Sequence, residues 1–140
     1  MYMRISAQIH NQEGKHKVRL TTNDQTRSMA IAPKETGFGS SASGGELLFL
    51  ALATCFCNDI YREAEKKNIP VQSVDVSVEG DFGGPGDPAR NVVYRARVTA
   101  QASEEEIHSL MQHTDQMAEI QNTLRSAIPV TLTKIEAVSV

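Results

Sequence analysis

Tryptophan is absent from this 140-residue sequence, and aromatic residues together make up only 5% of it. Surfaces that bind single-stranded nucleic acid stack the bases on aromatic side chains, and nucleic-acid-binding proteins in general carry a basic face. The formal net charge here is −3, so the sequence has no basic excess either. We therefore expect no nucleic acid among the partners of this protein.

Long apolar runs are also missing. The most apolar stretch, residues 47–57, is shorter than the roughly 20 residues that a bilayer-spanning helix needs. The opening residues, MYMRISAQIH, lack the apolar segment of a signal peptide. We therefore expect a cytoplasmic protein without membrane partners, in a compartment that keeps thiols reduced.

Cysteine is scarce, and the two that occur, Cys55 and Cys57, are too few for a disulfide framework. On a helix they would lie about 200° apart around the axis, so a disulfide between them would need local unwinding. The CxC spacing is not that of a zinc site, and His108 and His113 are poorly spaced to chelate a metal. We predict no metal and no cofactor, and each cysteine is either a small buried hydrophobe or a reactive thiol.

The first third of the sequence has the two-residue period of half-buried strands. Apolar and polar residues alternate over residues 5–9 and again over 18–20, and residues 11–14 (NQEG) predict the turn of a hairpin. Residues 27–32 (RSMAIA) predict a third short strand. A loop rich in glycine and serine follows it, with no packing pattern of its own.

A long helix is predicted in the middle of the chain. Ser43 and Glu46 form a capping box directly before the apolar residues 47–57, and Asn68 with Pro70 ends the helix. The first half of this helix is apolar all round, which is typical of a helix buried on every side. A single small domain can hardly cover such a helix, so we infer a homodimer in which two copies of it pack together.

The second half of the chain begins with a predicted hairpin. Residues 74–79 and 92–99 alternate between apolar and polar, and the segment between them is rich in turn residues. Its glycines match no nucleotide-binding pattern, which again argues against a cofactor. A second capping box, from Ser103 to Glu106, predicts a helix.

A further helix is predicted around residues 115–127, and residues 130–140 (VTLTKIEAVSV) predict a closing strand. The order is thus strands, a long helix, a strand pair, short helices and a strand. Segregated strands and helices indicate an α+β fold rather than a doubly wound parallel sheet. The length is that of one domain, so we predict a single domain over residues 1–140.

Three segments carry a family resemblance: GGELLFLALATCF, AEKKNIPVQSVDVSVEGDF and SEEEIHSLMQHTDQMAEIQNTL. In this order and spacing the sequence resembles the OsmC/Ohr family, named for osmotically inducible protein C and organic hydroperoxide resistance protein. The resemblance covers most of the chain from residue 36 onward, and the acidic–Leu–Leu run leading to A-x-C-F is its most specific part. It implies an intertwined homodimer, with antiparallel sheets of both chains wrapped around the two central helices. It also implies reduction of organic hydroperoxides by a thiolate between the subunits.

The resemblance transfers the family's site only in part. Cys55 falls on the peroxidatic cysteine of the central helix, but Ala118 stands where the family has its second cysteine. Gly45 occupies the usual place of the active-site glutamate. Glu46 could substitute for it, although the capping box explains Glu46 without a catalytic role. The arginine of the first hairpin has no clear equivalent, and Arg19 is the residue we take as its replacement.

These departures shape the hypotheses. Without a second family cysteine, a sulfenic acid at Cys55 must react with Cys57, with the partner subunit or with an external small thiol; the external thiol fits best. Our first hypothesis is therefore a one-cysteine reduction of organic hydroperoxides in oxidative-stress defence. It predicts a lowered Cys55 pKa, for which Lys15, Lys17 and Arg19 are candidate causes. The alternatives are a non-catalytic dimer that binds a small hydrophobic ligand, and a purely structural dimer.

Overall fold

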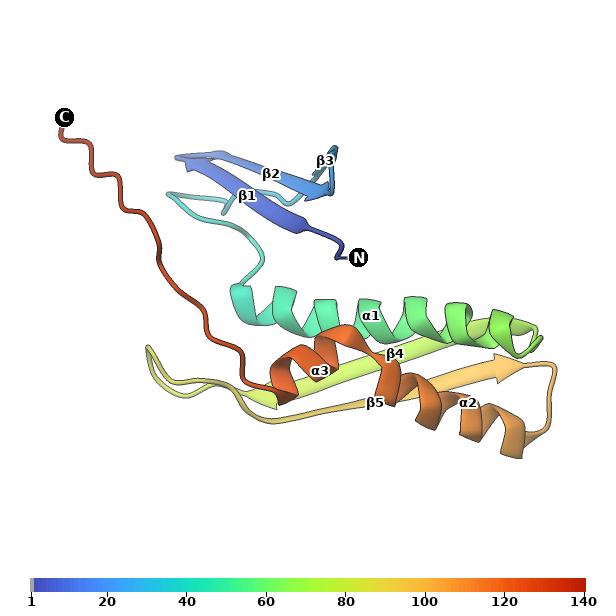
Figure 1. The fold of residues 1–140 in the computed structure, drawn as a ribbon. Coiled ribbons are helices and arrows are strands. Elements are labelled where there is room, and N and C mark those ends of the chain that lie inside the picture. The colour runs from blue at the N-terminus through green and yellow to red at the C-terminus, as the bar shows by residue number, and fades with distance from the viewer. Residues whose placement is uncertain (1) are drawn as a thin grey trace. The chain divides into compact units, whose positions relative to one another are not determined.

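The computed structural model describes residues 2–140, which divide into two compact units, residues 2–48 and residues 49–140. The elements in chain order are β1 (Ile5–Gln12), β2 (Lys15–Thr22), β3 (Gln25–Met29), α1 (Gly44–Lys66), β4 (Val71–Asp81), β5 (Arg90–Ala100), α2 (Glu104–Met117) and α3 (Glu119–Arg125) (Figure 1). Both sheets are antiparallel, and strands are segregated from helices. The predicted α+β class is confirmed.

The first unit contains a three-stranded sheet in the order β1–β2–β3. The predicted hairpin is present, and its turn is tight: Gln12 pairs with Lys15, and Gly14 has a φ of 68° that favours glycine. The third strand begins earlier than the predicted residues 27–32. Asn23 has a φ of 54° and reverses the chain directly after β2, so that pairing resumes at Gln25.

Helix α1 begins and ends where the capping signals predict. The Ser43 N–H donates to the Glu46 side chain at 2.8 Å, and the Glu46 N–H donates to Ser43 Oγ at 3.1 Å. These are the two reciprocal bonds of a capping box. At the other end, Asn68 has a φ of 56° and the Ile69 N–H donates to the Ala64 carbonyl, which closes the helix as a left-handed C-terminal cap does.

The core lies in the second unit, between the β4–β5 hairpin and the helices. Fully or nearly fully buried side chains from α1 meet Leu110 of α2, and alternate residues of both strands complete the core. In register, Val74 pairs with Val98 and Val76 with Ala96, so the apolar positions of the two strands share one face. The predicted alternation in this hairpin is confirmed.

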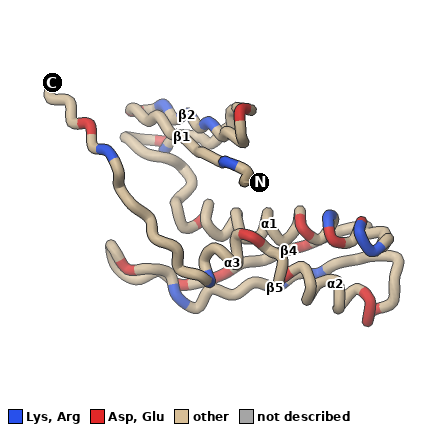
Figure 2. The backbone as a smooth tube through the Cα atoms, viewed as in Figure 1, with Lys and Arg blue, Asp and Glu red and all other residues tan. Residues whose placement is uncertain are grey.

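Helix α1 is covered along one face only. Leu52 and Phe56 are 4% and 2% exposed, whereas Leu50 is 59% exposed. One chain therefore leaves part of this helix open, and the predicted burial on every side, which requires two copies of the helix to pack together, stays a prediction. The charged residues of α1 gather toward its C-terminal half (Figure 2).

The C-terminal third departs from the prediction at two places. Instead of one helix around residues 115–127, α2 ends at Met117 and α3 begins at Glu119, because Ala118 between them is extended (φ −72°, ψ 108°). The predicted strand over residues 130–140 is absent, and Val130 and Val138 are 96% and 87% exposed. A strand requires a hydrogen-bonded neighbour, and within the described chain this segment has none. Among the described helices, none has both the length and the hydrophobicity needed to cross a bilayer.

Candidate functional site

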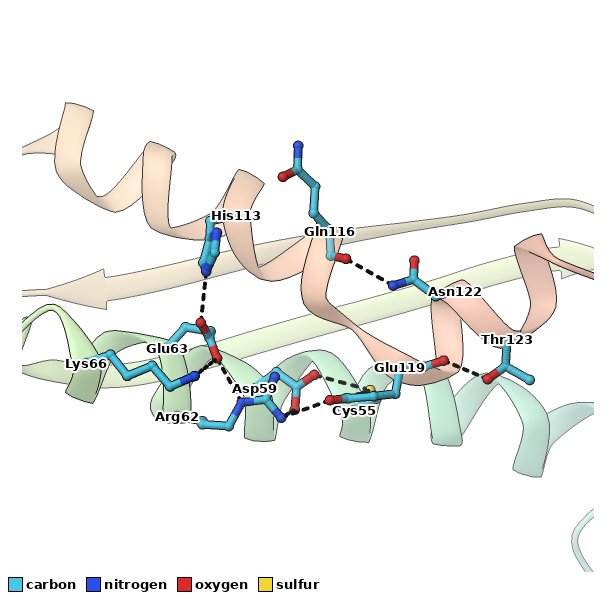
Figure 3. A network of polar contacts seen from close by, with 10 residues as sticks. All are labelled: Cys55, Asp59, Arg62, Glu63, Lys66, His113, Gln116, Glu119, Asn122 and Thr123. Carbon is cyan, nitrogen blue, oxygen red and sulfur yellow. Dashed lines mark hydrogen bonds and ion pairs between the residues drawn. The ribbon is translucent and has the colours of Figure 1, made fainter. Parts of the chain in front are cut away.

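The second half of α1 carries a row of polar side chains on one side of the helix (Figure 3). Cys55, Asp59, Glu63 and Lys66 are spaced by three or four residues, and such positions are neighbours on a helix surface. The apolar part of the helix thus gives way to a charged row that begins at a cysteine. Asp59 and Glu63 are buried, although they are carboxylates.

The break between α2 and α3 brings a further carboxylate to this row. Ala118 is fully buried in an extended conformation, and the chain turns there so that Glu119 opens α3 beside α1. The Glu119 side chain remains 61% exposed. Its carboxylate accepts a hydrogen bond from the Cys55 thiol.

Cys55 lies between two carboxylates. Its Sγ is 3.5 Å from Asp59 Oδ2 and 3.7 Å from Glu119 Oε1. Burial raises the pKa of the Cys55 thiol; hydrogen bonding from the Ile120 backbone opposes this, and the charges of Asp59 and Glu119 reinforce it. At neutral pH the resting group is therefore a protonated thiol that donates to a carboxylate. The lowered pKa that the peroxidase hypothesis predicts is not found in this chain.

Asp59 and Glu119 form an unequal pair. The Asp59 side chain is 8% exposed, and this burial is the largest cause that raises its pKa to about 6. The hydrogen bond and charge repulsion with Glu119 raise the pKa further, and the charge of Arg62 opposes the shift. Burial also acts to raise the pKa of Glu119, but hydrogen bonds from Asp59 and Arg62 lower it overall. When the pair holds one proton, that proton is on Asp59.

Arg62 holds the carboxylates together. Its Nη1 is 3.1 Å from Asp59 Oδ1 and 3.0 Å from Glu119 Oε2, and its Nε is 2.8 Å from Glu63 Oε2. The guanidinium fork can hold several oxygens in fixed positions, as a lysine ammonium cannot. Arg62 thus fixes Asp59 and Glu119 relative to Cys55.

Glu63 links this site to α2. Its Oε1 is 2.8 Å from His113 Nε2, and its Oε2 accepts from Arg62 and from Lys66 at 3.1 Å. Hydrogen bonds from Arg62, His113 and Lys66, in that order, lower the pKa of Glu63 to about 2. The carboxylate is therefore ionised at neutral pH, and it orients Arg62.

The cluster also has the spacing of a cation site. One donor atom each from Cys55, Asp59 and Glu119 lie within 4.8 Å of one another. Thiolate and carboxylate oxygens are ligands of several divalent metals. Both carboxylates are ion-paired with Arg62, however, so the guanidinium supplies the positive charge that a metal would bring. This pairing disfavours metal binding at the cluster.

Of the residues predicted from sequence, Cys55 lies in this cluster, and Glu46 and Arg19 lie in the first unit. The carboxylate of Glu46 accepts from the Ser43 backbone, as the capping box predicts. Arg19 lies on β2 in the first unit, where it lines a cavity of about 230 Å³ with Gln8, His10 and Lys17.

Sequence reasoning missed Asp59, Arg62 and Glu119. The first two stand four and seven residues after Cys55, a helical spacing that could have been recognised. Glu119 had no such signal, because its position depends on the extended Ala118. Cys57 is half-buried, and none of the side-chain hydrogen bonds of residues 2–140 involves it.

The chain thus combines an α+β fold of antiparallel sheets with a long helix, α1, that carries a half-buried cysteine. The family model described as "OsmC-like protein" matches residues 37–133, and the chain belongs to this family. Among curated proteins, none matches the chain in sequence.

Solved structures agree on the fold. An OsmC-like protein from Mycoplasma pneumoniae is 19% identical with a TM-score of 0.63, over 89% of this chain and 88% of its own. An organic hydroperoxide resistance protein OsmC from Legionella pneumophila is 20% identical with a TM-score of 0.57, over 87% and 89%. An OsmC-like protein from Vibrio cholerae is 13% identical with a TM-score of 0.58, over 88% and 93%. At these identities the likeness concerns the fold.

Proposed function

We propose that this protein reduces organic hydroperoxides through Cys55, as a homodimer and with an external small thiol as reductant. The observation that carries the proposal is the position of the Cys55 thiol, which is half-buried and held against Asp59 and Glu119 beside Arg62. Membership of the OsmC-like family supports it, as does the hydroperoxide resistance named for the Legionella relative.

The reaction balances with one cysteine. The sulfur attacks the outer peroxide oxygen, the O–O bond breaks, and the products are a cysteine sulfenic acid and an alcohol. A first molecule of external thiol condenses with the sulfenic acid, which gives a mixed disulfide and water. A second molecule attacks that disulfide and releases Cys55 as a thiol. In this proposal Arg62, which pairs with Asp59 and Glu119, stabilises negative charge on the leaving oxygen.

The absence of a second family cysteine shapes this cycle. Ala118, next to Glu119, takes the place of that cysteine, and Cys57 points away from Cys55 around the helix. An external thiol therefore regenerates Cys55 in our proposal. Glu119 is 61% exposed, so a small thiol can approach the sulfur from its side.

The dimer is proposed from apolar surface that one chain leaves open. Leu50 on α1 is 59% exposed, Ile9 on β1 is 58% exposed, and the C-terminal residues 130–140 carry further exposed aliphatic side chains. Large exposed apolar patches mark association surfaces. Analytical ultracentrifugation should give twice the chain mass of 15.3 kDa if the protein is a homodimer. The mass of one chain would refute this part of the proposal.

The activity is tested by intact-mass measurement after brief exposure of the reduced protein to stoichiometric cumene hydroperoxide. We expect rapid addition of one oxygen, which Cys55→Ser abolishes and Cys57→Ser leaves unchanged. Addition of a small thiol should then convert the oxidised form to a mixed disulfide. Oxidation no faster than that of a free small thiol would end the peroxidase interpretation.

A second candidate function is the binding of a small, mostly apolar ligand without redox chemistry. A cavity of about 570 Å³ lies between α2 and β5; apolar Phe56, Ala96 and Met111 line it, and His108 and Asp115 add polar groups. The raised pKa of the Cys55 thiol also favours this candidate over catalysis. Ligand affinity that survives Cys55→Ser, measured by calorimetry, would distinguish it from the first.

A further inference from the structure

Asp59 is a buried carboxylate in contact with the reacting sulfur, and the chemistry described so far assigns it no part. We infer that Asp59 is the acid–base catalyst of Cys55, which accepts the thiol proton and returns it to the leaving oxygen. This inference rests on the proposed hydroperoxide reduction and adds a catalytic residue to it.

The geometry supports a direct proton transfer. Asp59 Oδ2 is 3.5 Å from Cys55 Sγ, within reach of a hydrogen bond to sulfur, and both side chains come from one helix at i and i+4. The other Asp59 oxygen is held by Arg62 at 3.1 Å. Arg62 therefore keeps Oδ2 directed at the thiol, while the surrounding core shields the carboxylate from water.

The groups that face Asp59 set its affinity for a proton. From α1 these are Cys55 and Arg62, and from α3 it is Glu119. The pKa of about 6 that results lies close to neutral pH, where a general base can both take up and release a proton efficiently. Glu63 and His113 face each other and act on Asp59 only through Arg62.

The proton follows a closed path. The Cys55 S–H bond breaks as Asp59 takes the proton, and the sulfur electron pair attacks the outer oxygen of the organic hydroperoxide. The O–O bond breaks, and the departing alkoxide takes the proton from Asp59. The products are the sulfenic acid and an alcohol, and Asp59 is again a carboxylate. The hydroperoxide is the only oxidant that this step requires.

A purely electrostatic role for Asp59 predicts the opposite effect of substitution. A negative charge beside a thiol disfavours the thiolate, so removing the charge by Asp59→Asn should speed the reaction if charge is all that matters. A general base predicts that the same variant is slower at neutral pH. Glu119→Gln is the second variant, because it keeps the base and removes one of the groups that raise the pKa of that base.

The experiment measures second-order rate constants with cumene hydroperoxide between about pH 5 and pH 10. The proteins compared are wild type, Asp59→Asn, Glu119→Gln and the control Asp75→Asn, whose side chain is exposed on β4. For wild type we expect a rate that rises through about pH 6 and then levels, as the base ionises. Asp59→Asn should be slower by about tenfold or more at pH 7, and its rate should keep rising with pH over the whole range, because its thiol must ionise without a base. The rate of Glu119→Gln should level below about pH 6, because the variant removes the hydrogen bond and the charge that help to raise the pKa of Asp59.

Two readouts separate the possible failures. Wild type that reacts with hydroperoxide no faster than a free thiol overturns the proposed function and this step with it. Fast wild type with an equally fast or faster Asp59→Asn overturns the role of Asp59 alone. Iodoacetamide alkylation over the same pH range reports the thiolate without hydroperoxide, so it shows whether a rate change reflects ionisation of Cys55. If Asp59→Asn does not fold, the wild-type profile decides, and a rate that climbs steadily past about pH 8 refutes the inference.

Discussion

Asp59→Asn should make the folded protein more stable at neutral pH. Asp59 is 6% exposed, and burial is the largest cause of its raised pKa. Because the folded pKa lies above the ordinary value of 3.8, the folded chain binds this proton more tightly than the unfolded chain does. Ionisation of Asp59 therefore costs stability, which is lost as the pH rises from about 4 to about 6.

The size of this cost follows from the two pKa values. The gap between 3.8 and about 6 corresponds to about 3 kcal/mol for an isolated group. Glu119 is shifted in the opposite direction and recovers part of that free energy. With this offset, we expect Asp59→Asn to raise the free energy of unfolding by about 1–2 kcal/mol at pH 7.5, with little gain near pH 4.

Urea unfolding at the two pH values, at one fixed protein concentration, measures this difference. Asp75→Asn serves as the control, since its side chain is exposed on β4 and should show no such pH-dependent gain. An Asp59→Asn protein less stable than wild type at pH 7.5 would show that the lost ion pair with Arg62 outweighs burial. The reasoning from burial would then be wrong.

Two further predictions concern neighbouring residues. Ala118→Cys places a cysteine next to Glu119, and hydroperoxide should then produce a disulfide with Cys55 rather than a stable sulfenic acid. Intact mass after alkylation would show this disulfide, and persistence of the oxygen adduct would contradict the prediction. The fully buried position should make this variant less stable, by about 1–3 kcal/mol. The folded pKa of Glu63 lies below its ordinary value, so wild type loses stability as the pH falls from about 4.5 to about 2 and this group takes up a proton. Glu63→Gln cannot take up this proton, so the variant should not show this loss of stability. Acid unfolding followed by circular dichroism tests this, and an unchanged acid transition would refute it.

Local signals predicted most of the fold. The capping box at Ser43 and Glu46, the alternation in β4 and β5, and the family pattern around Cys55 each depend on residues close together in sequence. Such features form for local physical reasons, namely hydrogen bonds at a helix end and a two-residue period. The predicted strand over residues 130–140 is wrong because it rests on the local pattern alone. A strand also needs a hydrogen-bonded neighbour, and one chain does not offer it.

The family, the α+β class and the candidate nucleophile all follow from the order of residues along the chain. The surroundings of that nucleophile depend on the folded chain, because the extended Ala118 brings Glu119 from α3 to Cys55 across 64 residues. Burial of Asp59 also arises only when α1 packs against the rest of the second unit. A pKa depends on burial and on charges nearby in space, so the state of the Cys55 thiol could not be read from the order of residues.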